Sequence, residues 1–389
     1  MNVPKLRFKE FTDEWKQTPL KNIIYSNIIE APKPTTDYIR LGIRSHCKGT
    51  FHELVKIENI LSADKMYIVP KNNLILNITF AWEQAIAITD DNDEGKYISN
   101  RFPTFAFKDN QLPTFYKYII PQKRLKYDLN VASPGGAGRN RVLNKKLFLS
   151  IPVNIPLLKE QEKIANFLTT VDKKITNLEN TITSLENQKK GLLQQIFSQK
   201  LRFKDKNGNN YPNWEKKKLE DISNITMGQS PDSDFVNTEK IGTPFLQGNA
   251  EFTNKYPIEK YWCTKPQKIA NPTDILLSVR APVGAINIAN KKFCIGRGLS
   301  AISFNCNKLF GKYNLEFNLF QLIKKSQGST FSSINKKDIS EVILFIPCLE
   351  EQTKIADFLS AFDRKLENQK AQLEHWKQIK KGLLQQMFV

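Results

Sequence analysis

Histidine and cysteine are scarce in this chain of 389 residues, which has three histidines and five cysteines. The cysteines are scattered, with no C-x-x-C pair, and are Cys47, Cys263, Cys294, Cys306 and Cys348. The histidines form no zinc site with them at a familiar spacing; they are His46, His52 and His375. An odd number of scattered cysteines is typical of reduced thiols in a cytosol, so we expect neither disulfides nor a metal centre.

Long apolar runs are also missing. No stretch reaches 18 apolar residues, which argues against a membrane-spanning helix. The first residues, MNVPKLRFKEFTDEW, are charged and lack the apolar core of a signal peptide, so we expect a soluble, cytoplasmic protein. Glycine and proline are few, at 17 and 19, and 40% of the residues are hydrophobic. The chain can therefore form packed cores, and its length predicts two or three domains.

Acidic residues are clearly outnumbered by basic ones. The chain has 39 Asp and Glu against 58 Lys and Arg, which gives a formal net charge of +19. A basic excess of this size favours a polyanionic partner such as nucleic acid. A merely basic soluble protein would show the same composition, so the charge needs support from the pattern of residues.

An internal repeat is the strongest feature that the sequence does contain. KKGLLQQIF at Lys189–Phe197 returns as KKGLLQQMF at Lys380–Phe388, 191 positions later. The match extends upstream without a gap, so that residues 155–197 align with 346–388, and both copies contain I-P-x-L-x-E-Q-x-K-I-A-[ND]-F-L. Self-similarity at a fixed offset predicts two copies of one structural element.

Apolar residues in both copies recur with alternating steps of three and four. This heptad pattern is typical of a coiled coil, although two ordinary amphipathic helices remain an alternative. Three polar residues at core positions, Lys189, Gln369 and Lys380, either set the register or face a partner. The residues that we expect to pair the helices are Ile164, Leu168, Val171, Ile175, Leu178, Ile182, Leu185, Leu192, Ile196, Ile355, Leu359, Phe362, Leu366, Leu373, Trp376, Leu383 and Met387.

The order of segments predicts an antiparallel helix pair. The first helix leads into the domain between the copies, and the second leaves that domain, so the second can pair only by running back. The segment KLRFK follows the first helix at residues 200–204, and its other copy stands at residues 5–9, near the start of the chain. The architecture is thus cyclic in sequence with a pseudo-twofold relation, and we expect the two ends of the chain to lie close together.

Four segments follow from this pattern. We expect a first domain at 1–154, a central spacer helix at 155–199, a second domain at 200–345 and a distal spacer helix at 346–389. Runs such as NNLILNITFAW and DILLSVRAPVGAINI, broken by Gly, Pro and Asn, predict strands and turns in both domains. The fold class is therefore α+β, with two mixed α/β domains joined by an antiparallel pair of long coiled-coil helices.

Specific motifs give the chain a family resemblance. The segments DILLSVRAPVG (274–284), CIGRGLSAI (294–302), QGSTFSSINKKDISEVILFIPCLEEQ (327–352) and the two helix repeats resemble the DNA-specificity subunit of type I restriction–modification systems. The resemblance covers essentially the whole chain. The first domain departs from it, with NITFAWEQA in place of SVRAPVGA, which suggests that the two domains read different sequences.

The resemblance implies a division of labour. Each domain would be a target-recognition domain that reads one half of a split site in double-stranded DNA. The helices would set the gap and dock two methylation subunits, and restriction subunits would join that core. The chain would not be an enzyme and would hold no cofactor, while the assembled complex would use S-adenosylmethionine, ATP and Mg.

Candidate DNA-binding residues follow from side-chain chemistry, because Arg and Lys suit guanine and phosphate while Asn and Gln suit adenine. The alternative for each is a solvated or salt-bridged surface residue. In the first domain they are Arg101, Arg139, Asn140, Arg141 and Lys145. In the second domain they are Gln229, Ser230, Arg280, Arg297, Gln327, Gly328, Ser329, Thr330 and Lys336. Candidate docking residues for the methylation subunits are Glu160, Gln161, Glu351 and Gln352.

Two rival functions are weaker. A coiled-coil adaptor that does not bind DNA would explain the helices but neither the net charge of +19 nor the two domains. A self-contained methyltransferase would need an N-P-P-[FY] type pocket, yet the chain's one Asn-Pro pair, Asn271-Pro272, is followed by Thr. A nuclease would need clustered carboxylates for a metal ion, and the sequence offers none with suitable spacing.

Overall fold

The computed structural model describes residues 3–59, 65–135, 141–253, 255–327 and 333–388 of the chain. These residues form two compact units. Unit 1 comprises Met1–Leu178 with Gln372–Val389, and unit 2 comprises Glu179–Ala371. Each unit therefore contains one globular part and a section of both long helices.

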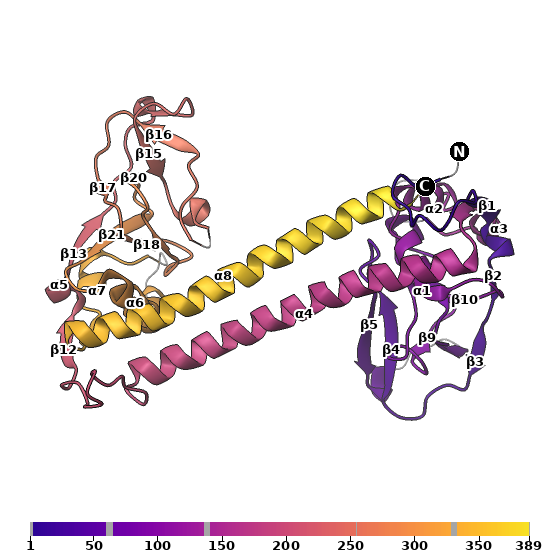
Figure 1. Ribbon diagram of the computed structural model, residues 1–389, viewed down its shortest axis with the longest axis horizontal. Coiled ribbons are helices and arrows are strands. Elements are labelled where there is room, and N and C mark those ends of the chain that lie inside the picture. Colours follow the sequence, from indigo (N-terminus) through magenta and orange to yellow (C-terminus); the bar gives the residue numbers. More distant parts are fainter. Residues whose placement is uncertain (1–2, 60–64, 136–140, 254, 328–332, 389) are drawn as a thin grey trace. The chain divides into compact units, whose positions relative to one another are not determined.

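The described residues in the globular part of unit 1 form a four-stranded sheet, a five-stranded sheet, a two-stranded sheet and three short α-helices (Figure 1). The four-stranded sheet has the order β2 (Ile24–Ser26), β10 (Thr104–Phe107), β7 (Leu74–Leu76), β8 (Ile86–Ile88). The five-stranded sheet has the order β3 (Ile29–Ala31), β6 (Met66–Ile68), β9 (Tyr97–Ile98), β4 (Tyr38–Ile43), β5 (Thr50–Val55). The strands β1 (Lys16–Pro19) and β11 (Pro152–Ile155) pair with each other, and the helices are α1 (Pro113–Ile119), α2 (Lys123–Val131) and α3 (Lys145–Ser150).

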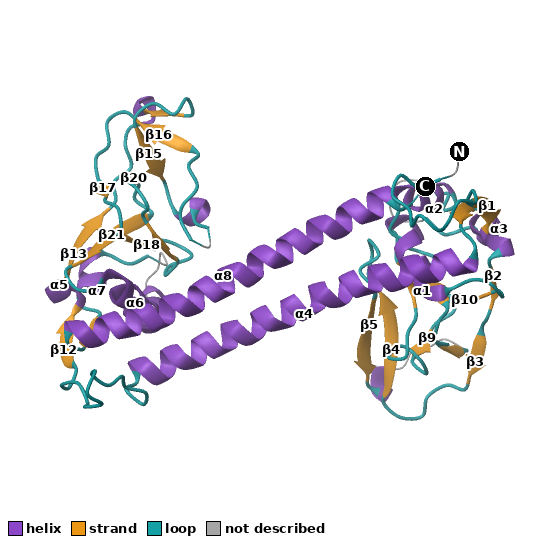
Figure 2. Ribbon diagram, viewed as in Figure 1, coloured by secondary structure: helices purple, strands orange, loops and turns teal. Residues whose placement is uncertain are grey.

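Unit 2 repeats this arrangement (Figure 2). Its four-stranded sheet has the order β13 (Ser223–Met227), β21 (Leu299–Phe304), β18 (Ile275–Ser278), β19 (Ile286–Ile288). Its five-stranded sheet has the order β14 (Val236–Asn237), β16 (Tyr261–Cys263), β15 (Thr243–Leu246), β20 (Phe293–Ile295), β17 (Ile269–Ala270). The strands β12 (Glu215–Lys218) and β22 (Ile343–Ile346) pair, and the helices are α5 (Leu219–Ile222), α6 (Lys308–Gln327) and α7 (Lys336–Ser340).

The five-stranded sheets differ at one edge. Both contain one parallel pair, β4 with β9 in unit 1 and β15 with β20 in unit 2. The fifth strand of unit 1, β3, adds beside β6, whereas the fifth strand of unit 2, β14, adds beside β16 at the opposite edge. The two units thus share one architecture and have diverged at the edges of the outer sheet.

The long helices are α4 (Leu158–Phe197) and α8 (Leu349–Gln386), and they run antiparallel in both units. In unit 2, Glu186 pairs with Lys370 at 2.7 Å and Lys189 pairs with Asp363 at 2.6 Å, so that rising numbers on α4 meet falling numbers on α8. None of the residues expected to pair the helices is exposed. The predicted α+β fold with an antiparallel helix pair is confirmed.

A polar cluster joins the globular part of unit 1 to both helices. The Tyr118 hydroxyl on α1 donates to Asp172 on α4 at 2.9 Å, and Lys380 on α8 pairs with the same carboxylate at 2.6 Å. Burial raises the pKa of Tyr118, so the phenol remains a donor at neutral pH. Lys380, at a heptad core position of α8, is therefore neutralised by Asp172 on the partner helix.

The same cluster recurs in unit 2 with the helices exchanged. Tyr313 on α6 donates to Asp363 on α8 at 2.7 Å, and Lys189 on α4 supplies the cation. The Lys189 ammonium also lies 5.3 Å from the centre of the Tyr313 ring. Each cluster fixes one longitudinal position of the pair, because sliding the helices would separate the lysine from its aspartate.

A buried carboxylate near the start of each long helix forms a second repeated contact. Glu160 accepts both of its 2.7 Å hydrogen bonds from Arg7 and a third, at 3.3 Å, from the indole of Trp15. In unit 2, Glu351 accepts two 2.8 Å hydrogen bonds from Arg202 and one of 3.0 Å from Trp214. A buried carboxylate with a bidentate arginine is fully paired, so these contacts hold the KLRFK segments against the helices.

The two ends of the chain meet in unit 1. The Leu6 amide donates to the Gln386 carbonyl at 2.9 Å, and the ring of Phe388 lies 6.0 Å from that of Trp15. The equivalent backbone bond in unit 2, from Leu201 to Gln195 at 3.0 Å, lies within one continuous stretch of chain. The prediction that the ends lie close together is confirmed, and the first residues complete the end of α8 as residues 200–204 complete the end of α4.

The ion pair in unit 1 generates a stability prediction. Substituting Arg7→Leu leaves the Glu160 carboxylate, which is 2% exposed, without its counter-ion. We expect the free energy of unfolding to fall by about 3 kcal/mol, and the double variant Arg7→Leu/Glu160→Leu to recover a large part of it. Urea unfolding of the full chain measures both, with Lys5→Leu, an exposed lysine of the same segment, as the control. Equal losses in the Arg7 and Lys5 variants would contradict this role.

Candidate nucleic-acid interface

Three loops of unit 2 meet through close glycine contacts. A Cβ on Gly228 would lie 2.1 Å from the carbonyl oxygen of Gly296, and a Cβ on Gly298 would lie 2.7 Å from that of Gln247. The Gly228 amide donates to Leu299 at 2.9 Å. Side chains at these glycines would push the loops apart, so the loops after β13, β15 and β20 can converge only because they carry glycine.

This convergence brings four polar residues together. Gln229, Ser230, Gln247 and Arg297 lie on the three loops, and the Ser230 hydroxyl accepts the Arg297 amide at 3.2 Å. Beside them is a groove of about 620 Å³, lined also by Tyr261 of β16 and by residues of β14. Of the predicted DNA-binding residues, the structure thus gathers Gln229, Ser230 and Arg297 at one place.

The groove has the chemistry of a base-reading surface. Arg297, Gln229 and Gln247 are exposed. Across the parts of unit 2 that the structure describes, their side chains have no recorded hydrogen bond or ion pair. Arginine can donate two parallel hydrogen bonds to guanine, and glutamine can both donate to and accept from adenine. Sequence reasoning missed Gln247, although its place just after a buried apolar run, in FLQGN, was a usable signal.

Arg280 lies on a different loop, directly after β18. Its side chain is exposed and is not part of the groove. The loop is held by Ser278, whose hydroxyl donates to the Pro282 carbonyl at 2.7 Å and accepts the Ala285 amide at 2.8 Å. Gly284 has a φ of +97°, which favours glycine, and a Cβ there would make only an ordinary contact of 3.6 Å with Ile323 of α6.

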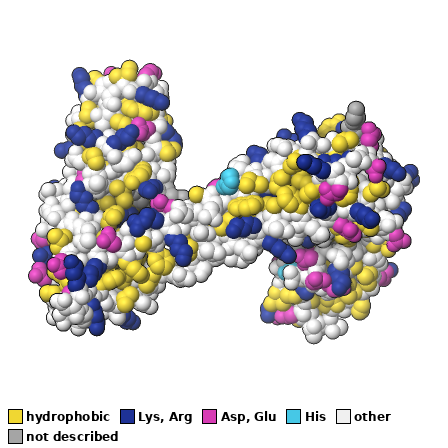
Figure 3. All heavy atoms as spheres, viewed as in Figure 1, with side chains coloured by type: hydrophobic (Ala, Val, Ile, Leu, Met, Phe, Trp, Pro, Cys, Tyr) yellow, Lys and Arg dark blue, Asp and Glu magenta, His cyan; other side chains and the backbone are white. Residues whose placement is uncertain are grey.

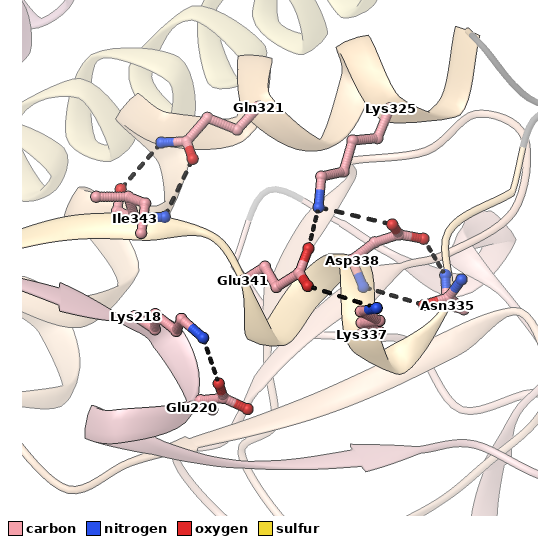
Figure 4. Close-up of polar contacts among 9 residues, drawn as sticks. All are labelled: Lys218, Glu220, Gln321, Lys325, Asn335, Lys337, Asp338, Glu341 and Ile343. Carbon is pink, nitrogen blue, oxygen red and sulfur yellow. Dashed lines mark hydrogen bonds and ion pairs between the residues drawn. The ribbon is translucent and has the colours of Figure 1, made fainter.

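The predicted phosphate ligand Lys336 is the first residue of α7 and is exposed. Asn335 caps this helix by accepting the Asp338 amide at 3.0 Å. The neighbouring Lys325 is held by Glu341 at 3.0 Å, and that hydrogen bond lowers the pKa of the Glu341 carboxyl. Figure 4 shows the contacts of Lys325, Asn335 and Lys337 around α7. Across the described residues, the Lys336 side chain has no hydrogen bond or ion pair, so its ammonium is available to an anion.

Part of the predicted interface lies outside the described residues, namely Gly328, Ser329 and Thr330 in the second domain and Arg139 and Asn140 in the first. Gln327 is the last residue of α6, and its side chain is likewise not described.

Arg141 in unit 1 is engaged by its own domain. Its guanidinium donates to the carbonyls of Ser133 at 3.0 Å and Asn130 at 2.7 Å, at the end of α2, and lies 5.1 Å from the Trp82 ring. These contacts compete with any base contact. Lys145, the first residue of α3, is exposed and matches Lys336 in position.

Arg101 is exposed. Aligning SNRFPTFAF (99–107) with IGRGLSAISF (295–304) by sequence places Arg101 on Arg297, but the structure gives a different equivalence. The Arg101 carbonyl accepts the Ile78 amide at 3.0 Å, and the same contact in unit 2 joins Gly298 to Val279 at 2.9 Å. Arg101 therefore corresponds to Gly298, one residue beyond Arg297. The error arises because glycine-rich and serine-rich segments align poorly by sequence.

The predicted docking residues have a different role in the structure. Glu160, Gln161, Glu351 and Gln352 are 0–4% exposed. Gln161 accepts the Leu112 amide at 3.0 Å, and Gln352 accepts the amide of Asn307 at 3.1 Å. These side chains attach each globular part to the start of a long helix, and they are too buried to contact a partner.

Exposed apolar side chains recur at equivalent positions beside these helix starts. Leu6 is 41% exposed and Leu201 is 37% exposed. Aromatic rings pack next to them, Phe8 with Phe167 at 5.8 Å and its equivalent pair in unit 2 at 5.6 Å. We call this the repeated apolar patch; its members are Leu6, Phe8 and Phe167 in unit 1 and Leu201, Phe203 and Phe358 in unit 2.

Lys and Arg side chains are spread over the face shown in Figure 3 and alternate there with apolar and acidic ones. Among the described residues, no group of three or more His, Cys, Asp or Glu side chains could hold a metal ion. None of the described helices has both the length and the apolar character needed to cross a membrane.

Comparisons with known proteins give a consistent family. A sequence model of the type I restriction modification DNA specificity domain matches residues 17–187 and 211–375. The chain is 37% identical over 408 residues to the putative type I restriction enzyme MjaX specificity subunit of Methanocaldococcus jannaschii, covering 98% of this chain and 95% of that protein. It is 23% identical over 375 residues to the MjaVIII specificity subunit of the same organism, covering 91% and 84% of the two chains.

Solved structures share the fold. The type I restriction–modification S subunit from M. genitalium has a TM-score of 0.64 at 15% identity and covers 100% of this chain and 99% of its own. A chain from a structure of type I R-M complex assembly and conformational transition has a TM-score of 0.60 at 24% identity, with coverage of 96% and 97%. This chain therefore belongs to the family of DNA-specificity subunits of type I restriction–modification systems.

Proposed function

We propose that the chain directs a type I restriction–modification complex to a DNA site that is split into two unlike halves. Residues 1–154 and 200–345 each read one half, and the helical segments 155–199 and 346–389 set the gap between them. The chain itself is not catalytic. Methyl transfer and cleavage, with their S-adenosylmethionine, ATP and Mg, belong to its partner subunits.

The groove in unit 2 carries this proposal. Arg297 and Gln247 line the groove, and Gln229 lies on a loop beside it. Within the described part of the chain, these three exposed side chains have no hydrogen bond or ion pair, so ordering them costs entropy unless a ligand uses them. Their donors and acceptors match base edges in the major groove of DNA. The edge strand β14 lines the same groove and has no equivalent in unit 1, which supports different targets for the two domains.

Phosphate contacts are expected at equivalent positions in both domains. Lys145 and Lys336 each begin a short helix that is capped by an asparagine, Asn144 or Asn335. Both lysines are exposed. Such contacts add affinity and fix the orientation of a domain without reading sequence, which leaves discrimination to groups such as Arg297.

Two methylation subunits dock on the repeated apolar patch, one on each copy. A surface that occurs twice in one chain fits two copies of the same partner. The exposed Leu6, Leu201 and Phe167, with the partly buried rings beside them, are suited to the dry centre of a protein interface, which the buried Glu160 and Glu351 are not. Restriction subunits then join this core.

A pair of variants separates base reading from phosphate binding. In the assembled methylation complex, we expect Arg297→Ala to weaken specific binding by about 1–3 kcal/mol and to relax the motif at one position of the second half-site. Lys336→Ala should leave the motif unchanged and reduce the slope of log affinity against log salt by about 0.9. Methylation mapping and binding titrations at several salt concentrations measure these effects.

Two defined half-sites with a fixed gap in the methylated sequences of the wild type support the proposal. A single continuous motif, or methylation without sequence preference, would refute it. An Arg297→Ala variant that binds weakly but keeps the full motif would remove the base-reading role from this groove.

Docking on the repeated apolar patch predicts a change in stoichiometry. A glutamate in place of Leu6 or Leu201 introduces a charge into an apolar contact, so each single variant should retain one methylation subunit and the double variant none. Native mass spectrometry of the reconstituted complex counts the subunits. Leu147→Glu, at a residue that is 47% exposed and outside the patch, is the control and should retain both. Retention of both subunits by the double variant would contradict this docking surface.

A further inference from the structure

Unit 1 contains a hollow that is lined by both cationic and aromatic side chains. It has a volume of about 470 Å³ and lies between α2 and the short helical turn at Ala81–Glu83. We call it the cation–aromatic hollow. The lining residues that matter for its chemistry are His46, Trp82, Lys123, Lys126, Tyr127 and Arg141.

The sequence places the α2 residues of the hollow on one helix face. Lys123, Lys126, Tyr127 and Asn130 have the spacing i, i+3, i+4 and i+7, which aligns them along one side of a helix. The buried positions of α2 are Leu125 and Leu129, on the other side. The helix therefore faces its own core with leucine and faces the hollow with lysine and tyrosine.

The cations of the hollow are largely unopposed. Lys123 and Lys126 are exposed, and neither has a recorded ion pair within the described part of unit 1. Arg124, on the next face of α2, is by contrast paired with Asp128 at 3.0 Å. The one carboxylate that lines the hollow, Glu83, accepts a hydrogen bond from the Ser45 hydroxyl at 2.8 Å.

The walls of the hollow are fixed by hydrogen bonds. The Trp82 indole donates to the Thr79 carbonyl at 3.1 Å, and the Arg141 guanidinium stacks over the same indole while it holds the end of α2. The His46 amide donates to the Glu83 carbonyl at 2.7 Å. The two lysines remain free to adjust to a ligand, and Tyr127, which is 62% exposed, is contacted on its ring by Arg124 at 6.0 Å.

The equivalent place in unit 2 is different. There α6 is one continuous helix and turns apolar side chains, Leu319 and Ile323, toward the loop at Gly284. In unit 1, Pro121 separates α1 from α2 and starts a new helix with a basic face. The hollow is thus a property of the first domain and not of the shared architecture.

We propose that the cation–aromatic hollow binds a phosphate-bearing nucleotide, and that its source is the DNA strand that flanks the first half-site. Lys123 and Lys126 contact the phosphates, and Tyr127 supports the adjoining sugar or base with its ring. A free nucleotide has the same chemistry, but an open hollow on a DNA-reading domain is better placed for a continuous strand. This inference rests on the proposed function.

Salt dependence of DNA binding tests the inference. The double variant Lys123→Ala/Lys126→Ala, in the assembled methylation complex with a duplex that carries the methylated motif, should lose two phosphate contacts. We expect the slope of log affinity against log salt to fall by about 1.8 with the motif unchanged. The control is Lys173→Ala/Lys174→Ala, which removes the same charge from exposed positions of α4 in the same unit and should keep the wild-type slope.

Three results would overturn the inference. One is a slope that falls equally in the control, or in neither variant, while the wild type binds its motif. Another is the loss of a methylation subunit from the variant, which would assign the hollow to a protein partner. The third is that added ATP abolishes the difference in salt slope between the variant and the wild type, which would assign the hollow to a free nucleotide. A wild-type complex with no motif at all would instead refute the proposed function.

Discussion

The apolar stripe on each long helix is the constraint on which the rest of the structure depends. A single helix cannot bury its own apolar stripe, and a stripe with a 3.5-residue period is buried best against a matching helix. The two copies of the repeat bury each other's apolar stripes, and this pairing makes the chain run out along α4 and back along α8. The polar exceptions in the stripe, Lys189 and Lys380, meet Asp363 and Asp172, so they fix the register of the pair instead of weakening it.

Attachment of a globular part to the helix pair depends on a buried charge in each unit. Glu351 is 0% exposed and tolerates this burial because Arg202 and Trp214 supply three hydrogen bonds. In unit 1 the equivalent arginine, Arg7, comes from the beginning of the chain and is far in sequence from Glu160. The two units are therefore built alike although one is formed from a continuous stretch and the other from both ends. These contacts lie within each unit and do not involve the outer loops, so the loops are free to diverge, which suits domains that read different sequences.

The fold was largely predictable from the sequence because its signals are local or repeated. The heptad steps, the fixed offset of the repeat and the recurrence of KLRFK are enough to derive an antiparallel pair with adjoining chain ends. The candidate site was less accessible, because it depends on contacts between distant loops. Gln247 joins Arg297 only through glycine packing, and the burial of Glu160 depends on an arginine 153 residues earlier. Without those contacts, an acidic residue in a repeated motif resembles a docking residue.

The central claim is that the helix pair acts as the ruler between two half-sites. A matched insertion tests it most directly: seven residues after Leu178 in α4 and seven after Ala371 in α8 preserve the heptad register and lengthen the pair by about 10 Å. Because a base pair occupies about 3.4 Å, methylation mapping should find the same two half-sites with a gap about three base pairs longer. Methylation that persists with the original gap would contradict the account.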